Sequence, residues 1–266
     1  MNMQLTNKTI REIALEAPLT TRVFEEFKID YCCGGRVDFA EACQNAGVDP
    51  RLLQEKLETL ISSAEPESRA IEQSSPTDLI DHIVKTHHKF TRDELGRLGQ
   101  LMEKVVHKHG DAHPELIEIQ EKLYILNKEL LPHMAKEEMV LFPYIKELDN
   151  ATTRGRIAAP PHFGTVRNPV RMMMFEHDAA GDILRKMRSL SNDYAIPEGA
   201  CPSFGALYAG LEDLEKDLHR HIHLENNVLF EQAIELEGKQ SKVRSDAPSQ
   251  CSDDDGTKMY DCSGLF

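Results

Sequence analysis

Hydrophobic residues recur every three or four positions along most of this chain, which is the spacing of amphipathic α-helices. Two of these apolar stripes are interrupted in the same way, by a histidine and, four residues later, by a glutamate. They run through Leu123, Leu126, Leu130, His133, Glu137 and Val140, and through Leu211, Leu214, Leu218, His221, Glu225 and Val228. Burying imidazole and carboxylate groups costs free energy unless their polarity is compensated, so the pattern indicates a bound cation.

Each of these stripes follows another stripe that carries a single inward histidine. His177 lies on the same face as Met173 and Leu184, and it precedes His221 by 44 residues. The matching histidine of the first half, at position 88, precedes His133 by 45 residues. The sequence therefore predicts four helices with an internal two-fold likeness, whose inward polar residues are His, His-x-x-x-Glu, His and His-x-x-x-Glu.

The first of the four helices has two adjacent histidines, and only one of them can lie on its apolar face. Ile80 and Ile83 upstream favour His87, whereas Leu95 and the apolar residues after it favour His88. We place His88 in the core, with His87 as the alternative.

The order of these elements divides the chain into four parts. Residues 1–61 form a small helical unit, 62–75 a polar linker, 76–237 an up-and-down four-helix bundle and 238–266 a disordered polar tail. The start of the bundle has a clear signal in Ser75-Pro76, because serine caps a helix and proline fits its first turn.

Composition supports an all-α fold class, since the chain has no tryptophan and only 6% aromatic residues. The formal net charge of −14 argues against nucleic acids and anionic membranes as partners. The sequence contains no apolar run of membrane-spanning length, and its start lacks the apolar core of a signal peptide. We therefore expect a cytoplasmic protein with no nucleic-acid partner and no membrane partner.

The four imidazoles and two carboxylates match the way in which helical bundles hold two metal ions. A glutamate can bridge both ions while the histidine four residues before it binds one of them. Octahedral iron or manganese suits this mixed nitrogen and oxygen set, whereas a structural zinc site takes about four ligands in a closed tetrahedron. With an oxo or hydroxo bridge, roughly one position per ion stays open for oxygen, nitric oxide or peroxide.

Other polar residues of these helices lie near the predicted ligands. Glu129 and Asp217 each precede a ligand histidine by four residues, one helical turn. We hypothesise that they hydrogen-bond the ligands or carry protons, the alternative being ordinary residues at the edge of the stripe. His219 and His223 stand roughly 200° around the helix from His221, and we expect them to be solvated.

Cysteine usage points to free thiols, because the six cysteines include no C-x-x-C pair of the zinc-ribbon or thioredoxin type. Cys32 and Cys33 are adjacent in a Tyr-Cys-Cys-Gly-Gly turn. Such a pair could ligate a metal, carry a redox equivalent or exchange a group, and it could equally be a tight turn of small residues. Cys251 and Cys262 lie in the polar tail, and we assign them no role.

These motifs make the chain similar to the Repair of Iron Centres family, over residues from about 8 to 237. The resemblance rests on Asp30–Gly35, His133–Glu137, Glu176–Asp178 and His221–Phe230. It implies a small Cys-Cys-Gly-Gly domain followed by a hemerythrin-like bundle with two non-haem irons, oxo- or hydroxo-bridged. The implied iron ligands are His88, His133, Glu137, His177, His221 and Glu225, and the implied thiol-exchange residues are Cys32 and Cys33.

The function implied by this resemblance is the repair or protection of iron–sulfur clusters under nitrosative and oxidative stress, by iron donation or by nitric oxide processing. Its partners would be damaged iron–sulfur proteins and small molecules such as nitric oxide or oxygen. A hemerythrin-like carrier or sensor of these gases is one alternative, although hemerythrin oxygen carriers typically use five histidines and lack a Cys-Cys domain. A nitric oxide reductase is the other. We expect a non-enzymatic repair protein, and the sequence leaves open whether it is a homodimer.

Overall fold

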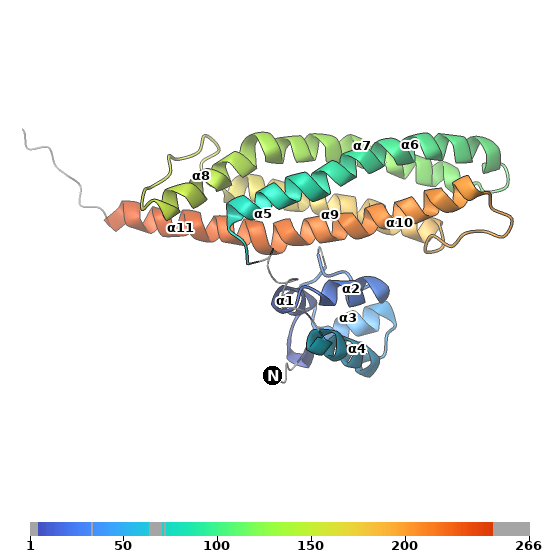
Figure 1. Cartoon of the computed structure of the whole chain (residues 1–266), viewed down its shortest axis with the longest axis horizontal. Coiled ribbons are helices and arrows are strands. Elements are labelled where there is room, and N and C mark those ends of the chain that lie inside the picture. Colours follow the sequence, from blue (N-terminus) through green and yellow to red (C-terminus); the bar gives the residue numbers. More distant parts are fainter. Residues whose placement is uncertain (1–4, 33, 64–70, 72, 247–266) are drawn as a thin grey trace, which may run out of the picture.

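The computed structural model describes residues 5–32, 34–63, 71 and 73–246. It confirms the predicted all-α fold, since the regular elements of these residues are helices (Figure 1). Most of the predicted linker, Cys33, and the predicted tail beyond Asp246, with Cys251 and Cys262, lie outside the described residues. Among the described helices, none combines the length and the hydropathy that a membrane-spanning segment requires.

The N-terminal unit is a cluster of short helices around its own apolar core. It contains η1 (Leu5–Asn7), α1 (Ile10–Glu16), α2 (Thr20–Glu26), α3 (Phe39–Ala46) and α4 (Pro50–Ser63). Thr9 caps α1 through a capping box with Glu12, and Asp38 caps α3. These side-chain caps bond the free backbone N–H groups at the helix starts, so the short helices have defined first turns.

The bundle consists of four long helical stretches that run side by side (Figure 1). They are built from α5 (Pro76–His82), η3 (Ile83–His88), α6 (Lys89–His109), α7 (Glu115–Lys136), η4 (Glu137–Leu141), α8 (Phe142–Thr153), α9 (Arg167–Leu190), α10 (Pro202–His223), η5 (Leu224–Leu229) and α11 (Phe230–Asp246). The predicted start is confirmed, because the Ser75 hydroxyl accepts a hydrogen bond from the Asp78 N–H at 3.1 Å and Pro76 occupies the first turn.

Three of the four stretches contain a π-helical turn, namely η3, η4 and η5. Three of the six polar residues of the stripes lie in these turns: His88 ends η3, Glu137 begins η4 and Glu225 belongs to η5. A π turn widens the helix by one residue and is frequent at functional sites. The regular α-helix is therefore interrupted where the core becomes polar.

The fourth stretch is longer than predicted, because α11 continues to Asp246. The prediction that disorder begins at Gly238 is therefore wrong for residues 238–246. Gln240 gives the reason: its buried amide accepts from the Ala158 N–H at 2.8 Å and donates to the Leu148 carbonyl at 3.1 Å. A polar side chain thus ties α11 to α8 and to the connection before α9, and hydrophobic periodicity gives no sign of it.

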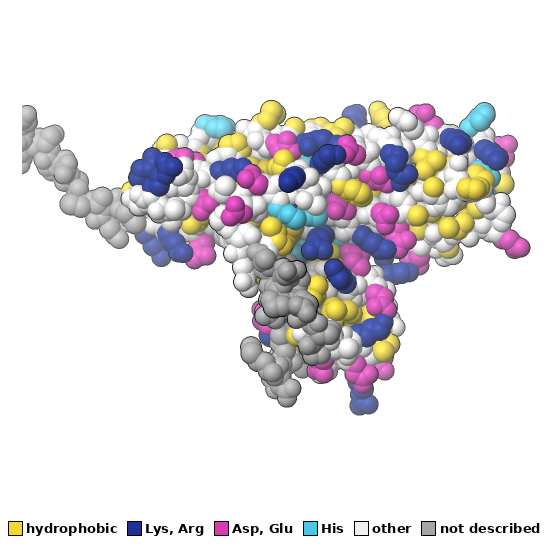
Figure 2. Space-filling view, in the orientation of Figure 1, with side chains coloured by type: hydrophobic (Ala, Val, Ile, Leu, Met, Phe, Trp, Pro, Cys, Tyr) yellow, Lys and Arg dark blue, Asp and Glu magenta, His cyan; other side chains and the backbone are white. Residues whose placement is uncertain are grey.

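The N-terminal unit packs against the outer face of α10 (Figure 1). Ile222 of α10 is 1% exposed and belongs to the apolar core of the N-terminal unit. Ion pairs flank this contact: Arg11 to Glu231 at 3.0 Å and Lys28 to Asp193 at 2.6 Å. Figure 2 shows acidic and basic side chains along this seam. The apolar contact is the main source of binding energy, because exposed ion pairs contribute little.

Replacing Ile222 by alanine should loosen the N-terminal unit without unfolding the bundle. Removing this buried side chain is expected to cost about 2–4 kcal/mol of docking free energy. Backbone hydrogen exchange in α1–α4 should accelerate, while exchange in α6 and α7 stays as in the wild type. The control is Ile117→Ala, because Ile117 is 57% exposed on α7; equal exchange in the two variants would contradict the assignment.

Candidate metal centre

The structure brings all six predicted ligand residues together inside the bundle, and each is at most 2% exposed. They form two overlapping groups. One group is His88, Glu137, His221 and Glu225, and the other is His133, Glu137, His177 and Glu225; within each, the candidate ligand atoms lie within 4.8 Å of one another. Both glutamates belong to both groups.

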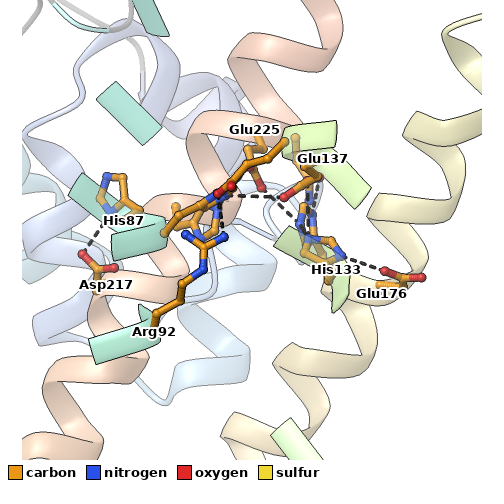
Figure 3. Close-up of polar contacts among 12 residues, drawn as sticks. His87, Arg92, His133, Glu137, Glu176, Asp217 and Glu225 are labelled. Atoms are coloured by element: carbon orange, nitrogen blue, oxygen red, sulfur yellow. Dashed lines mark hydrogen bonds and ion pairs between the residues drawn. The ribbon is translucent and has the colours of Figure 1, made fainter. Parts of the chain in front are cut away.

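Each glutamate directs one oxygen toward each group (Figure 3). Glu137 places Oε2 3.5 Å from His88 Nε2 and Oε1 3.4 Å from His133 Nε2. Glu225 places Oε1 3.0 Å from His221 Nε2 and Oε2 3.2 Å from His177 Nε2. The carboxylates therefore join the two groups, which is the arrangement needed to share them between two cations.

The histidines face one another in pairs through the same ring nitrogen. The Nε2 atoms of His88 and His221 are 3.1 Å apart, and those of His133 and His177 are 2.9 Å apart. A neutral imidazole presents either a proton or a lone pair at this nitrogen, and two lone pairs so close repel each other. A proton or a cation must therefore accompany each pair.

In three of the four histidines, the ring nitrogen that points away from the centre, Nδ1, has a hydrogen-bond acceptor. His88 donates to Glu138 at 2.6 Å and His133 donates to Glu176 at 2.7 Å. His177 Nδ1 lies 2.8 Å from the amide oxygen of Asn226. A carboxylate can only accept, so Nδ1 carries the proton and the Nε2 lone pair of a neutral ring points to the centre. This is the usual support of histidines that bind metals.

The buried carboxylates raise the pKa values of two of the histidines that they face. Burial lowers the pKa of His88, but the nearby carboxylates of Glu137 and Glu225 outweigh it and raise the pKa to about 10. Burial also lowers the pKa of His133, and Glu137 again outweighs it and raises the pKa to about 9. The buried carboxylates thus demand positive charge, which protons supply when no other cation does.

The chemistry of the donor set fits a metal. Glu137 is fully buried, and neither of its oxygens has a hydrogen-bond partner among the described residues. An unsatisfied buried carboxylate is costly, and a cation between it and the imidazoles would remove that cost. A set of imidazole and carboxylate ligands suits iron, whereas structural zinc sites are commonly rich in thiolates.

The two residues expected to back the ligands do not do so directly. Asp217 hydrogen-bonds His87 Nδ1 at 2.9 Å, and the His87 ring stacks on His221 at 5.7 Å between centroids. Glu129 is exposed and lines a cavity of about 310 Å³ that reaches His133 between α7 and α9. Neither hydrogen-bonds a ligand histidine in the part of the chain described, so that expectation is wrong, and their role as proton carriers stays a prediction.

The expectation that His219 and His223 are solvated is also wrong. His223 is 1% exposed and its ring lies 5.4 Å from that of Tyr31, while His219 Nδ1 is 2.9 Å from Glu25. Both face the N-terminal unit, on the side of α10 opposite to the ligands. Ile222 between them was the available signal, because an apolar residue at that phase marks a second buried face.

The N-terminal unit presents Cys32 next to this contact. Cys32 follows Tyr31, is 7% exposed and has its Sγ 3.4 Å from an Asp30 carboxylate oxygen. Asn227 of η5 donates from its amide to the Tyr31 carbonyl at 3.5 Å. One described member of the Cys-Cys pair is therefore held against the helix that supplies His221 and Glu225.

Comparison with known proteins agrees with this description. Residues 79–233 match the hemerythrin HHE cation binding domain, and residues 6–61 match a domain of unknown function (DUF542). A probable iron–sulfur cluster repair protein of Haemophilus influenzae is 34% identical over 233 residues, which cover 87% of this chain and 99% of that protein. The iron–sulfur cluster repair protein YtfE of Dickeya chrysanthemi is 33% identical over 232 residues, and that of Yersinia pseudotuberculosis 34% over 233, with the same coverage.

Proposed function

The chain belongs to the iron–sulfur cluster repair family with a hemerythrin-type cation-binding domain, and from that premise we propose that it holds two iron ions and uses them to repair or protect iron–sulfur clusters. Each ion would lie in one of the two groups, with Glu137 and Glu225 bridging and two histidines on each side. When bound, the iron pair supplies redox chemistry and an open position for a small molecule such as nitric oxide, oxygen or peroxide.

The observation that carries the proposal is the sharing of both carboxylates. A single cation would need only one group of four side chains, whereas the oxygens of Glu137 and Glu225 are divided between His88 and His221 on one side and the other histidine pair on the other. Four histidine ligands, rather than five, favour repair over reversible oxygen carriage.

The remaining residues would connect the centre to its partners. We propose residues 1–61 as the unit that exchanges a thiol-bound group with a damaged iron–sulfur protein, through Cys32 and its neighbour in sequence. A reducing compartment such as the cytoplasm would keep these groups as thiols. The cavity lined by His133 would bring a small molecule, or iron as cargo, to one edge of the centre.

Iron analysis and Mössbauer spectroscopy test the centre. The wild type should hold about two spin-coupled irons per chain, and Glu137→Ala/Glu225→Ala should lose both the coupling and most of the iron. The control is Glu147→Ala/Glu235→Ala, which removes two exposed carboxylates from α8 and α11. One tightly held zinc, or undiminished coupling in the first variant, would contradict the assignment.

A repair assay tests the function. The iron-loaded protein should restore the activity of an iron–sulfur enzyme treated with nitric oxide, and the Glu137→Ala/Glu225→Ala variant should not. A stable, reversible oxygen adduct without repair would favour a gas carrier, and catalytic nitrous oxide formation with a reductant would favour a nitric oxide reductase.

A further inference from the structure

We propose that the two cation positions hold their ions unequally, and that the position formed by His88 and His221 releases its iron first. This inference rests on the proposed function, because it concerns the same centre. It is argued from the groups behind the ligand histidines, which differ between the two positions.

The difference lies at His221. His133 and His177, which serve one position, both have an acceptor at Nδ1: a carboxylate of Glu176 and the amide oxygen of Asn226. In the other position His88 has Glu138, but His221 Nδ1 is buried and has no hydrogen-bond partner among the residues that the structure describes. The ring of His87 lies nearly parallel to that of His221, at 9° with the centroids 5.7 Å apart, and no hydrogen bond joins the two rings.

The internal two-fold likeness shows that this asymmetry is specific. In each half, the residue directly after the bridging glutamate reaches across to the stripe histidine of that half: Glu138 to His88, and Asn226 to His177. The histidines of the two His-x-x-x-Glu pairs, His133 and His221, do not match each other in this way. His133 bonds Glu176, the residue directly before His177, whereas the matching residue before His88 is His87, whose ring lies beside His221 without a hydrogen bond to it.

A hydrogen-bond acceptor at Nδ1 fixes the ring and makes Nε2 a better donor, and losing one costs 10- to 100-fold in metal affinity as a rule. The carboxylates contribute equally, because Glu137 and Glu225 each give one oxygen to either side. The position with His88 and His221 should therefore bind iron roughly 10- to 100-fold more weakly than its neighbour. An ion held in this way suits donation, while the tighter ion keeps the buried glutamates compensated.

The test is an equilibrium competition between the full-length protein and a chromophoric chelator for iron(II), without oxygen. An equilibrium measurement does not depend on how fast each ion enters or leaves its position. This matters because the cavity between α7 and α9 lies on the side of the tighter position, at His133. The wild type should release its two ions in separate steps. His88→Ala should keep one ion at the tighter affinity, and His177→Ala should keep one at the weaker affinity.

Two neighbouring asparagines provide a matched pair of variants. Asn226→Ala removes the acceptor of His177 and should reduce the affinity ratio to within about threefold of unity, whereas Asn226→Asp should restore or widen it. Asn227→Ala is the control, because Asn227 is equally buried (7% against 6% exposed) but bonds His223 and the Tyr31 carbonyl instead of a ligand. Circular dichroism and an unchanged capacity of two ions verify the fold of each variant.

The outcomes separate this inference from the proposed function. Two ions of equal affinity in the wild type, or an Asn226→Ala variant whose ratio matches that of Asn227→Ala, would overturn the inequality and leave the di-iron centre intact. A wild type that binds one ion or none would overturn the centre itself. Tighter binding in His177→Ala than in His88→Ala would reverse the assignment of the labile position.

Discussion

Iron-loaded protein should unfold roughly 15–30 °C above protein stripped by a chelator, when free iron exceeds its dissociation constant by about 1,000-fold. Each ion that binds only the folded state then adds about 4 kcal/mol to the free energy of unfolding, and 1 kcal/mol shifts the midpoint of a domain of this size by about 2–4 °C. The structure predicts so large a response because the bundle buries two carboxylates that need a cation. Glu137 and Glu225 are both 0% exposed.

Differential scanning calorimetry under anaerobic conditions measures this shift. Its control is Glu137→Ala/Glu225→Ala, whose midpoint should respond to iron by no more than a few degrees. Equal midpoints with and without iron in the wild type would show that the ions do not bind within the folded core.

The six candidate ligand residues could be predicted from the sequence because helical geometry fixes which residues face the core. Residues three and four positions apart lie on one face, so a histidine and a glutamate that interrupt a leucine stripe must point into the core. The choice of His88 over His87 followed from the same argument, and the structure places His88 in the group with His221. The amino-acid composition contributes only support for the all-α fold class and does not identify any ligand.

The groups behind the ligands could not be predicted in this way. Glu138 and Asn226 directly follow Glu137 and Glu225 and lie at the edge of the stripe, where periodicity does not distinguish a polar contact from a solvated residue. Their partners lie on another helix, and contacts between helices depend on how the bundle packs. The π turns that contain Glu137 and Glu225 add to the difficulty, because they rotate the residues that follow relative to a regular helix.

The second face of α10 was missed for a different reason. A single stripe explains the positions of His221 and Glu225, and a surface helix of a bundle normally has only one buried face. Here α10 also supports the N-terminal unit, so Ile222 and His223 are buried on the opposite side. The same helix therefore contributes His221 to the candidate metal centre with one face and packs against the N-terminal unit with the other.

The stability of the stripped protein should fall as pH rises from about 6.5 to 10, by an amount on the order of 5 kcal/mol. His88 and His133 have folded pKa values of about 10 and about 9, both raised by the buried glutamates against burial itself. A group whose pKa is raised in the folded state stabilises it fully below the unfolded pKa, near 6.5. That contribution is lost as pH rises through the folded pKa. The two histidines share their carboxylates, so their contributions do not simply add.

Iron reverses this dependence, because it competes with protons for the same Nε2 atoms. Binding at pH 7.5 should release close to two protons per chain, from His88 and His133, and the gap between the unfolding midpoints of loaded and stripped protein should widen toward pH 9. Titration calorimetry in buffers of different ionisation enthalpy counts the protons, and thermal scans at pH 6.5 and pH 9 measure the gap. His88→Gln/His133→Gln should remove most of the pH dependence of the stripped protein, whereas His162→Gln, in the connection before α9, should leave it unchanged. A stripped wild type that is equally stable at both pH values would show that protons do not take the place of the metal, and that the buried carboxylates are compensated by some other group.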